Sequence, residues 1–460
     1  MPVVVLVADG LRPDTLEQAI AEGAVPALAR LRDEGGLSTV TSVFPSVTGP
    51  AYAPFLIGRF PGSVGLPGLR WYDRTRKIAR MPFHSRSYVG AEMRHVDTDL
   101  DPAAPTIFEL APSNLAAMNV IGRGLHPTEK LSQGLRFILR TGITHFRGNV
   151  RGWLAIDRDI AAQFIDRFVE ERPAFAFAAL TGIDKTSHAR GHGSALAAQA
   201  LSIVDLTAGA IRFAAERAGI WEDTHLWIVS DHGHSRVLHH EDLAALVAGW
   251  GHSVIAHPWP MRTRPDAAVM VSGNAMAHIY TGLRSLGGSA AKTEQLAGLL
   301  LARKSVDLLL LPCEGGCEVR SAHRGNATIS WQADSYSYHP HTGDPLGIGP
   351  QSSLSDDAAY DITVDSEYPD SIVQIANLAQ SSRCGDIVLS AAEDWDFRAR
   401  YEPIPHVSTH GSLRREHMLV PLLTNRPPRT APRRTTDIMP SALCALGLEP
   451  PSKLDGRSFL

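Results

Sequence analysis

Cysteine is scarce in this sequence. Four cysteines occur among 460 residues, too few for a disulfide scaffold in a chain of this length. Cys313 and Cys317 are separated by three residues instead of the two that are usual in zinc motifs, and no second pair accompanies them. We therefore predict free thiols at both positions, and also at Cys384 and Cys444.

Long apolar segments are absent as well. The sequence contains no uninterrupted apolar run of the ~18 residues that a membrane-spanning helix requires. It opens with Met1 and an apolar run at residues 3–8, without the basic region and small-residue cleavage site of a signal peptide. These features predict that the protein has no membrane span and is cytoplasmic.

The chain also lacks an excess of positive charge. Lys and Arg total 44 against 48 Asp and Glu, which gives a formal net charge of -4. This balance argues against a dedicated nucleic-acid binder and against a polybasic membrane-surface protein. With 44% hydrophobic and 20% charged residues, the chain can bury a large core, and its length suggests two or three structural units.

What the sequence does contain is a series of apolar runs that end near acidic residues. Residues 3–8 run into Asp9, residues 174–180 lead to Asp184, and residues 226–229 lead to Asp231. Helical spacing fills residues 157–171 and 195–218, which lie between these runs. Short apolar runs alternating with helices predict an α/β fold with a mostly parallel central sheet flanked by helices.

The ends of these strands are candidates for a functional site. Ligands of open α/β sheets collect at the carboxyl ends of the strands, so the three acidic residues should meet at one edge. His232 follows Asp231 directly, and His188 lies one helical turn after Asp184. Taken singly, each acid has a simpler explanation as a turn or helix-cap residue, and an isolated Asp-x-x-x-His pair is weak evidence.

A turn rich in proline and hydroxyl groups, residues 45–54, contains Thr48 and Gly49. It opens what reads as a helix through residues 55–58. A hydroxyl at a helix start lies among free backbone N–H groups that stabilise negative charge on a phosphoryl oxygen. The alternative is that Ser46 or Thr48 is only the N-cap of the helix.

Three regions make up the predicted organisation. Residues 1–235 form the first part of the core, with an irregular insertion at about residues 62–149 whose Arg70, Trp71 and Tyr72 are candidates to bind substrate, or else form a solvated surface. Residues 236–400 form a smaller inserted α+β cap that rejoins the main sheet near residues 386–390. Residues 401–460 form the second part of the core, with His410 and a closing helix at residues 436–446.

Together these residues form a constellation suited to two metal ions. A two-metal hydrolytic site needs carboxylate and imidazole ligands for ions ~3.5–4 Å apart, with an oxygen nucleophile and open positions for substrate. The candidate residues, each at a strand end or in a loop, are Asp9, Thr48, Asp184, His188, Asp231, His232 and His410.

The order and local sequence of these motifs resemble the alkaline phosphatase superfamily. The matching segments are Asp9-Gly10, the turn at residues 44–50, Asp184-x-x-x-His188, the Ser-Asp-His-Gly segment at residues 230–233, Thr409-His410-Gly411 and the C-terminal tail. Within the superfamily, the sequence is most similar to the type I phosphodiesterase/nucleotide pyrophosphatase branch. The resemblance implies an alkaline phosphatase-like core, and it covers residues 1–60, about 174–235 and 405–460.

The resemblance also implies roles for individual residues. Asp184, His188 and His410 would hold one zinc, and Asp9, Asp231 and His232 the other. Thr48 would be the nucleophile at the second metal, where coordination lowers the pKa of its hydroxyl, and attack on phosphorus would give a phosphothreonine intermediate. His192 and His234 would contribute no more than second-sphere or pocket contacts.

The chain departs from the family pattern at two positions. Ala51 stands where we expect an Asn, three residues after the nucleophile, that helps to hold a phosphoryl oxygen, and Ser187 stands where Gly is frequent. Phosphate would then be positioned by backbone N–H groups near Thr48 and Gly49 or by an insertion residue. The formylglycine motif of sulfatases is absent around Thr48, so an arylsulfatase is not expected.

We therefore predict a metal-dependent hydrolase that cleaves phosphodiester or nucleotide pyrophosphate-type bonds. Its cofactors would be two Zn²⁺ ions, with Mn²⁺ as another possibility, and its partner a small-molecule phosphate ester instead of a nucleic-acid polymer. Hydrolysis of phosphonates or phosphomonoesters at the same site is the alternative, and a non-catalytic metal-binding module is a further one. The sequence leaves the oligomeric state open.

Overall fold

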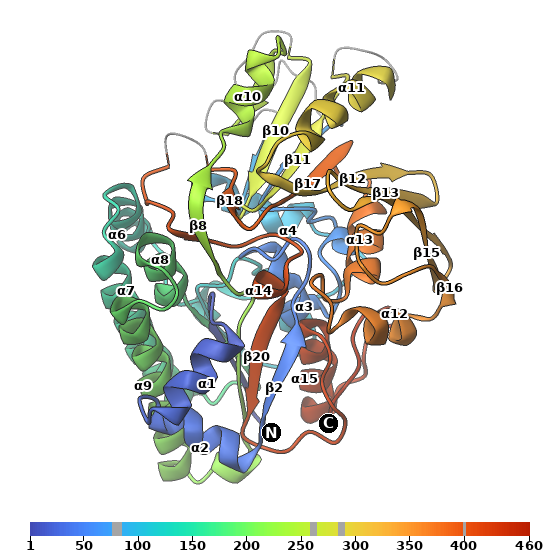
Figure 1. The fold of residues 1–460 in the computed structure, drawn as a ribbon. Helices are drawn as coiled ribbons and strands as arrows, with labels where there is room; N and C mark the ends of the chain where they lie inside the picture. The colour runs from blue at the N-terminus through green and yellow to red at the C-terminus, as the bar shows by residue number, and fades with distance from the viewer. Residues whose placement is uncertain (76–84, 258–264, 284–289, 399–401) are drawn as a thin grey trace.

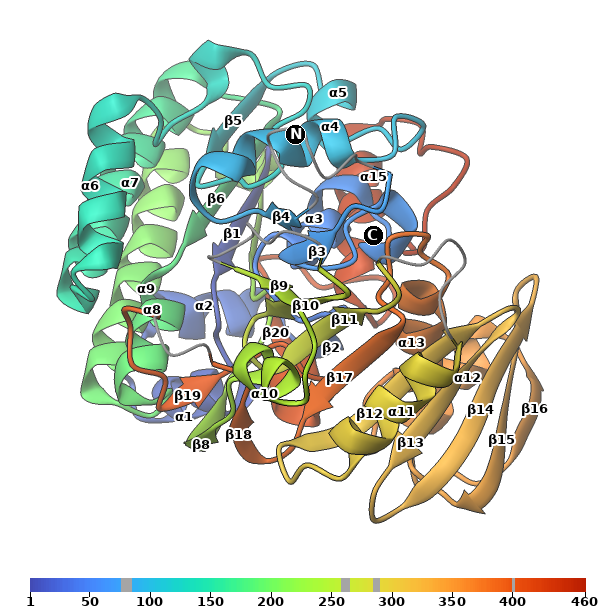
Figure 2. The same cartoon turned by 90° about the horizontal axis from the view of Figure 1, so that it is seen from above.

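The computed structural model describes residues 1–75, 85–257, 265–283, 290–398 and 402–460. The chain has an α/β fold built on two large sheets, as Figure 1 and, from above, Figure 2 show. Both termini lie beside the smaller sheet, far from the tip of the larger one (Figure 1).

The six-stranded sheet is the predicted central sheet. Its strands follow the order β2 (Leu37–Thr41), β20 (Leu419–Thr424), β7 (His225–Val229), β1 (Val3–Ala8), β6 (Phe175–Leu180) and β5 (Asn114–Ala117). The pairs β7–β1, β1–β6 and β6–β5 are parallel, while β20 runs antiparallel to both of its neighbours. The sheet is therefore mostly parallel, and only β20 opposes the common direction.

Both faces of this sheet are covered by helices. On β1, Val3, Val5 and Val7 belong to one apolar cluster, whereas Val4, Leu6 and Ala8 belong to another. The first cluster includes residues of α3 (Ala53–Ile57) and α15 (Ile438–Leu446), and the second includes residues of α2 (Pro26–Glu34), α7 (Val150–Glu171) and α9 (Ala195–Arg217). Burial on both faces explains why β1 and β6 are apolar throughout instead of alternating.

The nine-stranded sheet lies entirely within the predicted insert at residues 236–400. Its order is β16 (Gln351–Leu354), β15 (Ser335–Gly343), β14 (Gly325–Gln332), β13 (Gly316–Ser321), β12 (Val306–Cys313), β17 (Ile387–Ala391), β11 (Met276–Tyr280), β10 (Ala267–Ser272) and β9 (Val254–Ala256). All neighbouring pairs are antiparallel except β9–β10. The insert is more extensive than predicted, since its sheet has more strands than the central one.

One predicted strand belongs to the other sheet. Residues 386–390 were expected to rejoin the central sheet, but β17 pairs with β11 and β12 in the middle of the nine-stranded sheet. This prediction is wrong because an apolar five-residue strand indicates only that both of its faces are covered. It carries no information about which sheet covers them.

Residues 62–149 contain more regular structure than the sequence indicated. The strand β5 within this region is the edge strand of the central sheet, paired in parallel with β6. A hairpin of β3 (Arg70–Tyr72) and β4 (Ser85–Ser87) and a twelve-residue helix, α6 (Leu135–Phe146), also lie there. The prediction of an irregular insertion is therefore wrong for these segments, and α6 packs on α7 at the outer edge of the fold (Figures 1 and 2).

The remaining elements are short or peripheral. A three-stranded sheet contains β18 (Asp394–Asp396), β8 (Ser235–His240) and β19 (Ser408–Thr409). The other α-helices are α1 (Pro13–Ala21), α4 (Val96–Asp99), α5 (Ile107–Leu110), α8 (Gly182–Arg190), α10 (Leu243–Gly249), α11 (Ala290–Leu301), α12 (Asp356–Thr363), α13 (Ser371–Ala379) and α14 (Arg415–Met418).

One helix, α9, has the length and apolar composition of a membrane span. Half of its most apolar window, 50%, is buried inside the fold. That burial arises because the helix packs against the central sheet through residues such as Leu201, Val204 and Ile211. Its position is that of a core helix.

Candidate active site

The parallel strands β1, β6 and β7 end at the same edge of the six-stranded sheet, and this brings the acidic residues together. In the parallel register of β1, Val7 lies opposite Val229 of β7, and Ala8 lies opposite Leu180 of β6. Asp9 and Asp231 follow their strands almost at once, while Asp184 lies in the first turn of α8, which begins two residues after β6. All three carboxylates are buried, each with at most 1% of its surface exposed.

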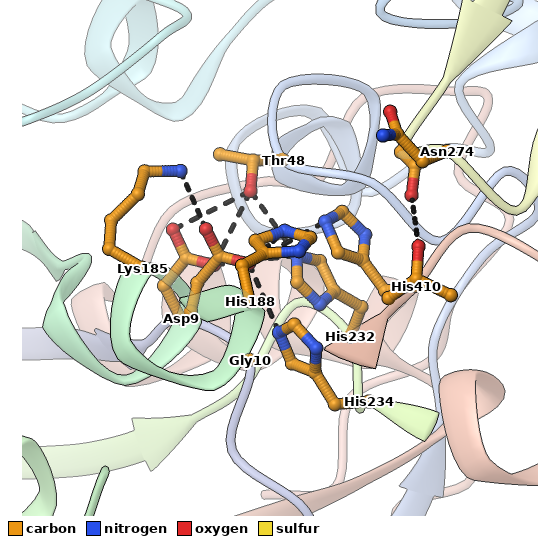
Figure 3. Close-up of polar contacts among 12 residues, drawn as sticks. Asp9, Gly10, Thr48, Lys185, His188, His232, His234, Asn274 and His410 are labelled. Carbon is orange, nitrogen blue, oxygen red and sulfur yellow. Dashed lines mark hydrogen bonds and ion pairs between the residues drawn. The ribbon is translucent and has the colours of Figure 1, made fainter. Parts of the chain in front are cut away.

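Asp9, Asp231 and His232 form one group of possible metal ligands. Their ligand atoms lie within 4.8 Å of one another, and His232 Nε2 is 3.4 Å from Asp9 Oδ1 and 3.6 Å from Asp231 Oδ2. Thr48 Oγ1 lies beside this group, 3.3 Å from Asp9 Oδ1 and 3.2 Å from His232 Nε2. The group and the hydroxyl have the composition that the sequence predicted for the second metal (Figure 3).

A second set of possible ligands surrounds Asp184. Its Oδ1 lies 3.1 Å from His188 Nε2, 3.1 Å from His234 Nε2 and 3.5 Å from His410 Nε2. Among the described residues, the groups with ligand atoms within 4.8 Å are Asp184 with His188 and His234, and Asp184 with His232 and His410. The predicted trio of Asp184, His188 and His410 is thus divided between two overlapping groups that share Asp184.

The histidines have a tautomer that suits metal binding. Nδ1 of His188, of His232 and of His410 lies 2.8–3.1 Å from the backbone oxygen of Ser408, Gly233 and Ser46, respectively. A carbonyl oxygen only accepts, so each Nδ1 carries the hydrogen and each Nε2 presents a lone pair. These lone pairs face carboxylate oxygens, which are also acceptors, and a cation between them would satisfy both.

The electrostatics of the cluster also fit bound cations. Burial, followed by the negative charges of Asp231 and Asp184, raises the pKa of Asp9 well above its usual value, and burial raises the pKa of Asp231. Asp231 Oδ2 is buried and has no hydrogen-bond partner among the described residues. Since buried carboxylates are stable when paired or bound to metal, the donor set fits divalent ions.

Gly10 is required by this close packing. It has a φ of 81°, and a Cβ atom at this position would lie 2.9 Å from the imidazole of His234. Only glycine combines this backbone conformation with this approach. The Asp9-Gly10 dipeptide therefore lets β1 deliver its carboxylate against the histidine cluster.

His234 contacts a candidate metal ligand directly, which agrees with the second-sphere contact predicted for it. It is fully buried, its Nε2 approaches Asp184 more closely than that of His410 does, and its Nδ1 lies 3.1 Å from Ser408 Oγ. Alternate residues of an extended chain face the same side, so the position of His234 two residues after His232 was a usable signal. His192, the other histidine near the motifs, belongs to none of these ligand groups.

Lys185 is a residue that the sequence did not single out. Its Nζ lies 2.6 Å from Asp184 Oδ2, and Figure 3 shows the amine on the same side of the cluster as the Thr48 hydroxyl. Burial opposes ionisation of Asp184, but Lys185 and His188 outweigh it and hold the pKa of this carboxyl well below its usual value. The ammonium thus partly neutralises the acidic cluster.

The residues predicted to bind substrate differ in their burial and in their contacts. Trp71 is fully buried, and its Nε1 donates to the Tyr88 hydroxyl at 2.9 Å; Tyr72 is 4% exposed and packs against Tyr280. Both rings belong to an apolar core cluster, so neither forms the solvated surface that was the alternative, and their part in substrate binding stays a prediction. Arg70 is partly buried, with Nη1 3.8 Å from Glu402 Oε1, and its role stays a prediction, as does that of Gly49 beside Thr48.

Ala51 is a core residue. It is fully buried in an apolar cluster with Val43, Phe44 and Phe60. That backbone N–H groups near Thr48 and Gly49 or an insertion residue position the phosphate stays a prediction.

The sequence of this chain matches a known protein family. The family model for type I phosphodiesterase/nucleotide pyrophosphatase matches residues 3–297, which is more than half of the chain. The chain belongs to this family. The predicted resemblance is confirmed, and this phosphodiesterase-family protein is a phosphoester hydrolase whose Asp and His groups could bind metal.

Solved structures share the fold of this phosphodiesterase-family protein at low sequence identity. Phosphonoacetate hydrolase from Sinorhizobium meliloti 1021, in complex with phosphonoformate, has a TM-score of 0.60 and 16% identity over 97% of this chain and 96% of that chain. Human ectonucleotide pyrophosphatase/phosphodiesterase 5 has a TM-score of 0.59 and 15% identity over 99% and 97%. The murine protein, in an inactive form with AMP, has a TM-score of 0.56 and 17% identity over 98% and 96%.

A comparison with curated protein sequences finds no significant match. The structural similarity extends over nearly the whole of each chain, so it includes the nine-stranded sheet as well as the central one. The α/β fold is thereby confirmed as that of the alkaline phosphatase-like relatives.

Proposed function

We propose that this protein hydrolyses phosphodiester bonds, including the pyrophosphate-type bonds of nucleotides, through a phosphothreonine intermediate on Thr48. The position of Thr48 is the observation that carries this proposal. Its hydroxyl can act as a nucleophile. Thr48 Oγ1 lies 3.3 Å from Asp9 Oδ1 and 3.2 Å from His232 Nε2. Asp9 Oδ1 and His232 Nε2 are hydrogen-bond acceptors, so the hydroxyl proton has an acceptor when the oxygen attacks phosphorus.

We assign the metal ligands to two zinc ions. Asp9, Asp231 and His232 would hold one ion, and Asp184, His188 and His410 would hold the other, with His234 positioning Asp184. Two zinc ions so bound would supply Lewis acidity toward the phosphoryl oxygens and the leaving oxygen. Mn²⁺ is an alternative for the same oxygen and nitrogen ligands.

The reaction divides into two displacements. In the first, the Thr48 oxygen forms a bond to phosphorus and the bond from phosphorus to the leaving oxygen breaks. In the second, water attacks the phosphothreonine, which restores the hydroxyl and releases the phosphorylated product. Lys185, near Thr48 and charged, would contact a phosphoryl oxygen and stabilise its negative charge in both transition states.

Replacement of the nucleophile tests this proposal. Thr48→Ala should abolish turnover of bis-p-nitrophenyl phosphate while about two zinc ions per chain remain, and Thr48→Ser should retain part of the activity because it keeps the hydroxyl. Acid quenching of wild type with a radiolabelled substrate should trap phosphate on Thr48. A stable chain that binds no metal would contradict the proposal and favour the non-catalytic module. Equal or better turnover of p-nitrophenyl phosphate would count against diester preference.

Phosphonate hydrolysis is the second candidate function. It is favoured by two cationic side chains, Lys185 next to Asp184 and Arg70 on the β3–β4 hairpin, which could bind a second anionic group on the substrate. The structural relative from Sinorhizobium meliloti was solved with phosphonoacetate, a substrate type that has such a group. Release of inorganic phosphate from phosphonoacetate without turnover of bis-p-nitrophenyl phosphate would support this function over diester hydrolysis. Lys185→Met should lose this release, and Lys185→Arg should retain part of it.

A further inference from the structure

The helix α6 exposes an unusually large apolar surface. Leu135, Ile138, Leu139, Ile143 and Phe146 are 72%, 62%, 54%, 52% and 78% exposed, respectively. The much longer α9 exposes only Leu206 and Phe213 to a similar degree among the large apolar residues. Contiguous apolar surface of this kind marks interaction sites in folded proteins.

These five side chains, which we call the α6 apolar face, lie on one side of the helix. At 100° per residue they span an arc of about 140°. The helix contacts the rest of the protein through the opposite side, where Thr144 is buried and Phe137 packs against the core cluster under α7. The helix is therefore anchored by its narrow side and turns its wide apolar side outward, at the edge of the fold (Figures 1 and 2).

The charge around the α6 apolar face has one sign. Residues 131–156 include Arg136, Arg140, Arg147 and Arg151 and no Asp or Glu. Arg140 is paired with Asp159, while the other three form no ion pair with the described residues. At 100° per residue, Arg136, Arg140 and Arg147 all fall on the same flank of the apolar face. The net charge of -4, which argued against a polybasic membrane-surface protein, describes the whole chain and conceals this local excess.

We propose that α6 is an interfacial helix through which the protein docks on anionic lipid membranes. An apolar face with Phe, Leu and Ile, flanked by Arg, is the composition of helices that lie in the headgroup region with their apolar side among the acyl chains. The unpaired arginines supply attraction to anionic headgroups. Self-association through the same face would bring the arginines of two copies into one interface. Residues 131–156 supply no acidic residue to pair with them, so an anionic lipid surface is the better partner.

Docking through α6 would also orient the active site. The helix contacts α7, and α7 contacts α8, which carries Asp184 and His188. Membrane attachment would thus bring the site close to the lipid surface. The docking surface does not depend on the proposed chemistry, because none of its residues belongs to the ligand groups around Asp9 and Asp184.

Vesicle flotation of the full-length protein tests this inference. Wild type should float with vesicles of phosphatidylcholine and phosphatidylglycerol, bind phosphatidylcholine alone much more weakly, and dissociate as salt is raised. Ile138→Gln with Ile143→Gln should lower the bound fraction at least about tenfold, and Arg136→Gln with Arg147→Gln should weaken binding only to the anionic vesicles. These exposed positions should leave the thermal unfolding temperature unchanged.

A matched control separates the α6 apolar face from exposed apolar residues in general. Leu206→Gln on α9 changes an equally exposed leucine and should leave vesicle binding as in wild type. Equal flotation of wild type and the double isoleucine variant would overturn the proposal, as would failure of wild type to bind anionic vesicles. A dimer in solution that the isoleucine variant converts to monomer, without vesicle binding, would overturn it in favour of a second copy of the chain.

Discussion

The two large sheets contribute to the active site in different ways. The six-stranded sheet delivers Asp9, Asp231 and His232 from the ends of its parallel strands, and Asp184 and His188 from the helix after β6. The nine-stranded sheet supplies none of the predicted ligands. Its β10–β11 turn instead holds the backbone around His410, where Ala275 N donates to His410 O at 3.0 Å and Thr409 Oγ1 donates to Gly273 O at 3.1 Å.

This difference follows from strand direction. Parallel strands all end at the same edge, so the residues that follow them converge on one place. Antiparallel strands end alternately at opposite edges, so consecutive turns of such a sheet point in opposite directions. The parallel sheet is thus suited to gather catalytic groups, and the antiparallel sheet to buttress one of them.

The comparison predicts the largest effect for a ligand of the parallel sheet. Asp184 contacts three histidines, so Asp184→Asn should remove a metal ligand shared by two groups. Turnover should fall by at least ~10³-fold, since loss of a direct ligand exceeds the ~10–100-fold loss typical of a second-sphere partner. Elemental analysis should show fewer than two metal ions per chain. Near-normal turnover with full metal content would contradict the assignment of Asp184.

A smaller effect is expected at His234. If it positions Asp184 instead of binding metal, His234→Gln should lower kcat/KM by about 10–100-fold and leave the metal content near that of wild type. Ser408→Ala removes the Oγ beside His234 Nδ1, 3.1 Å away, and should have a weaker effect in the same direction. Loss of one equivalent of metal in His234→Gln would show that His234 is itself a ligand.

A still smaller effect is expected from the β10–β11 turn. Asn274 has a φ of 65°, forms a bridge with His410, and donates through Nδ2 to Glu402 Oε2 at 2.6 Å. Asn274→Ala loses this hydrogen bond and places a less tolerant residue in the left-handed region, at a cost of about 1 kcal/mol. We expect kcat/KM to fall several-fold as His410 shifts.

Asn274→Gly is the matched control for the turn. Glycine relieves the backbone but also lacks the side-chain hydrogen bonding to Glu402 and to His406 Nδ1, so the two variants separate the backbone contribution from that of the side chain. If both variants lose the same activity, the side-chain hydrogen bonding is responsible; if only Asn274→Ala does, the backbone is. Full activity in both would mean that the nine-stranded sheet does not support His410.

The same contrast explains what could be read from the sequence. The ends of β1, β6 and β7 were recognisable because each is a short apolar run followed by an acid, and parallel strands make such ends converge. The sheet that contains β17 could not be identified, because its apolar sequence is equally compatible with either sheet. The strand β5, Asn114–Ala117, was missed because Asn and Ala have low strand propensity.

Individual side chains of the site were predictable only where local sequence determines their position. Thr48 lies in a turn whose composition marks it, and His188 is fixed relative to Asp184 by the helix. The burial of Trp71, by contrast, depends on its contacts with Tyr88, which is 17 residues away and follows a segment of no clear pattern. An aromatic residue among charged neighbours is typical of both a surface and a core position until its distant partners are known.

The smallest effect on activity is expected far from the β10–β11 turn, within the same sheet. Tyr338 of β15 is fully buried, donates to Asp344 Oδ1 at 2.6 Å and accepts from Leu346 N at 3.1 Å. Tyr338→Phe keeps the ring but leaves Leu346 N without this partner, which should lower the free energy of unfolding by about 1–2 kcal/mol. Because β15 is separated from β10 by β14, β13, β12, β17 and β11, kcat/KM should not change.

The control for this prediction lies on the same strand. Tyr336 is only partly buried, and its hydroxyl makes no hydrogen bond with the described residues, so Tyr336→Phe should leave both urea unfolding and turnover as in wild type. If Tyr338→Phe lowers stability without changing kcat/KM, the distal part of the nine-stranded sheet stabilises the fold independently of catalysis. A parallel loss of activity would instead mean that the sheet transmits its packing to His410 as one rigid unit, and the division of roles between the two sheets would not hold.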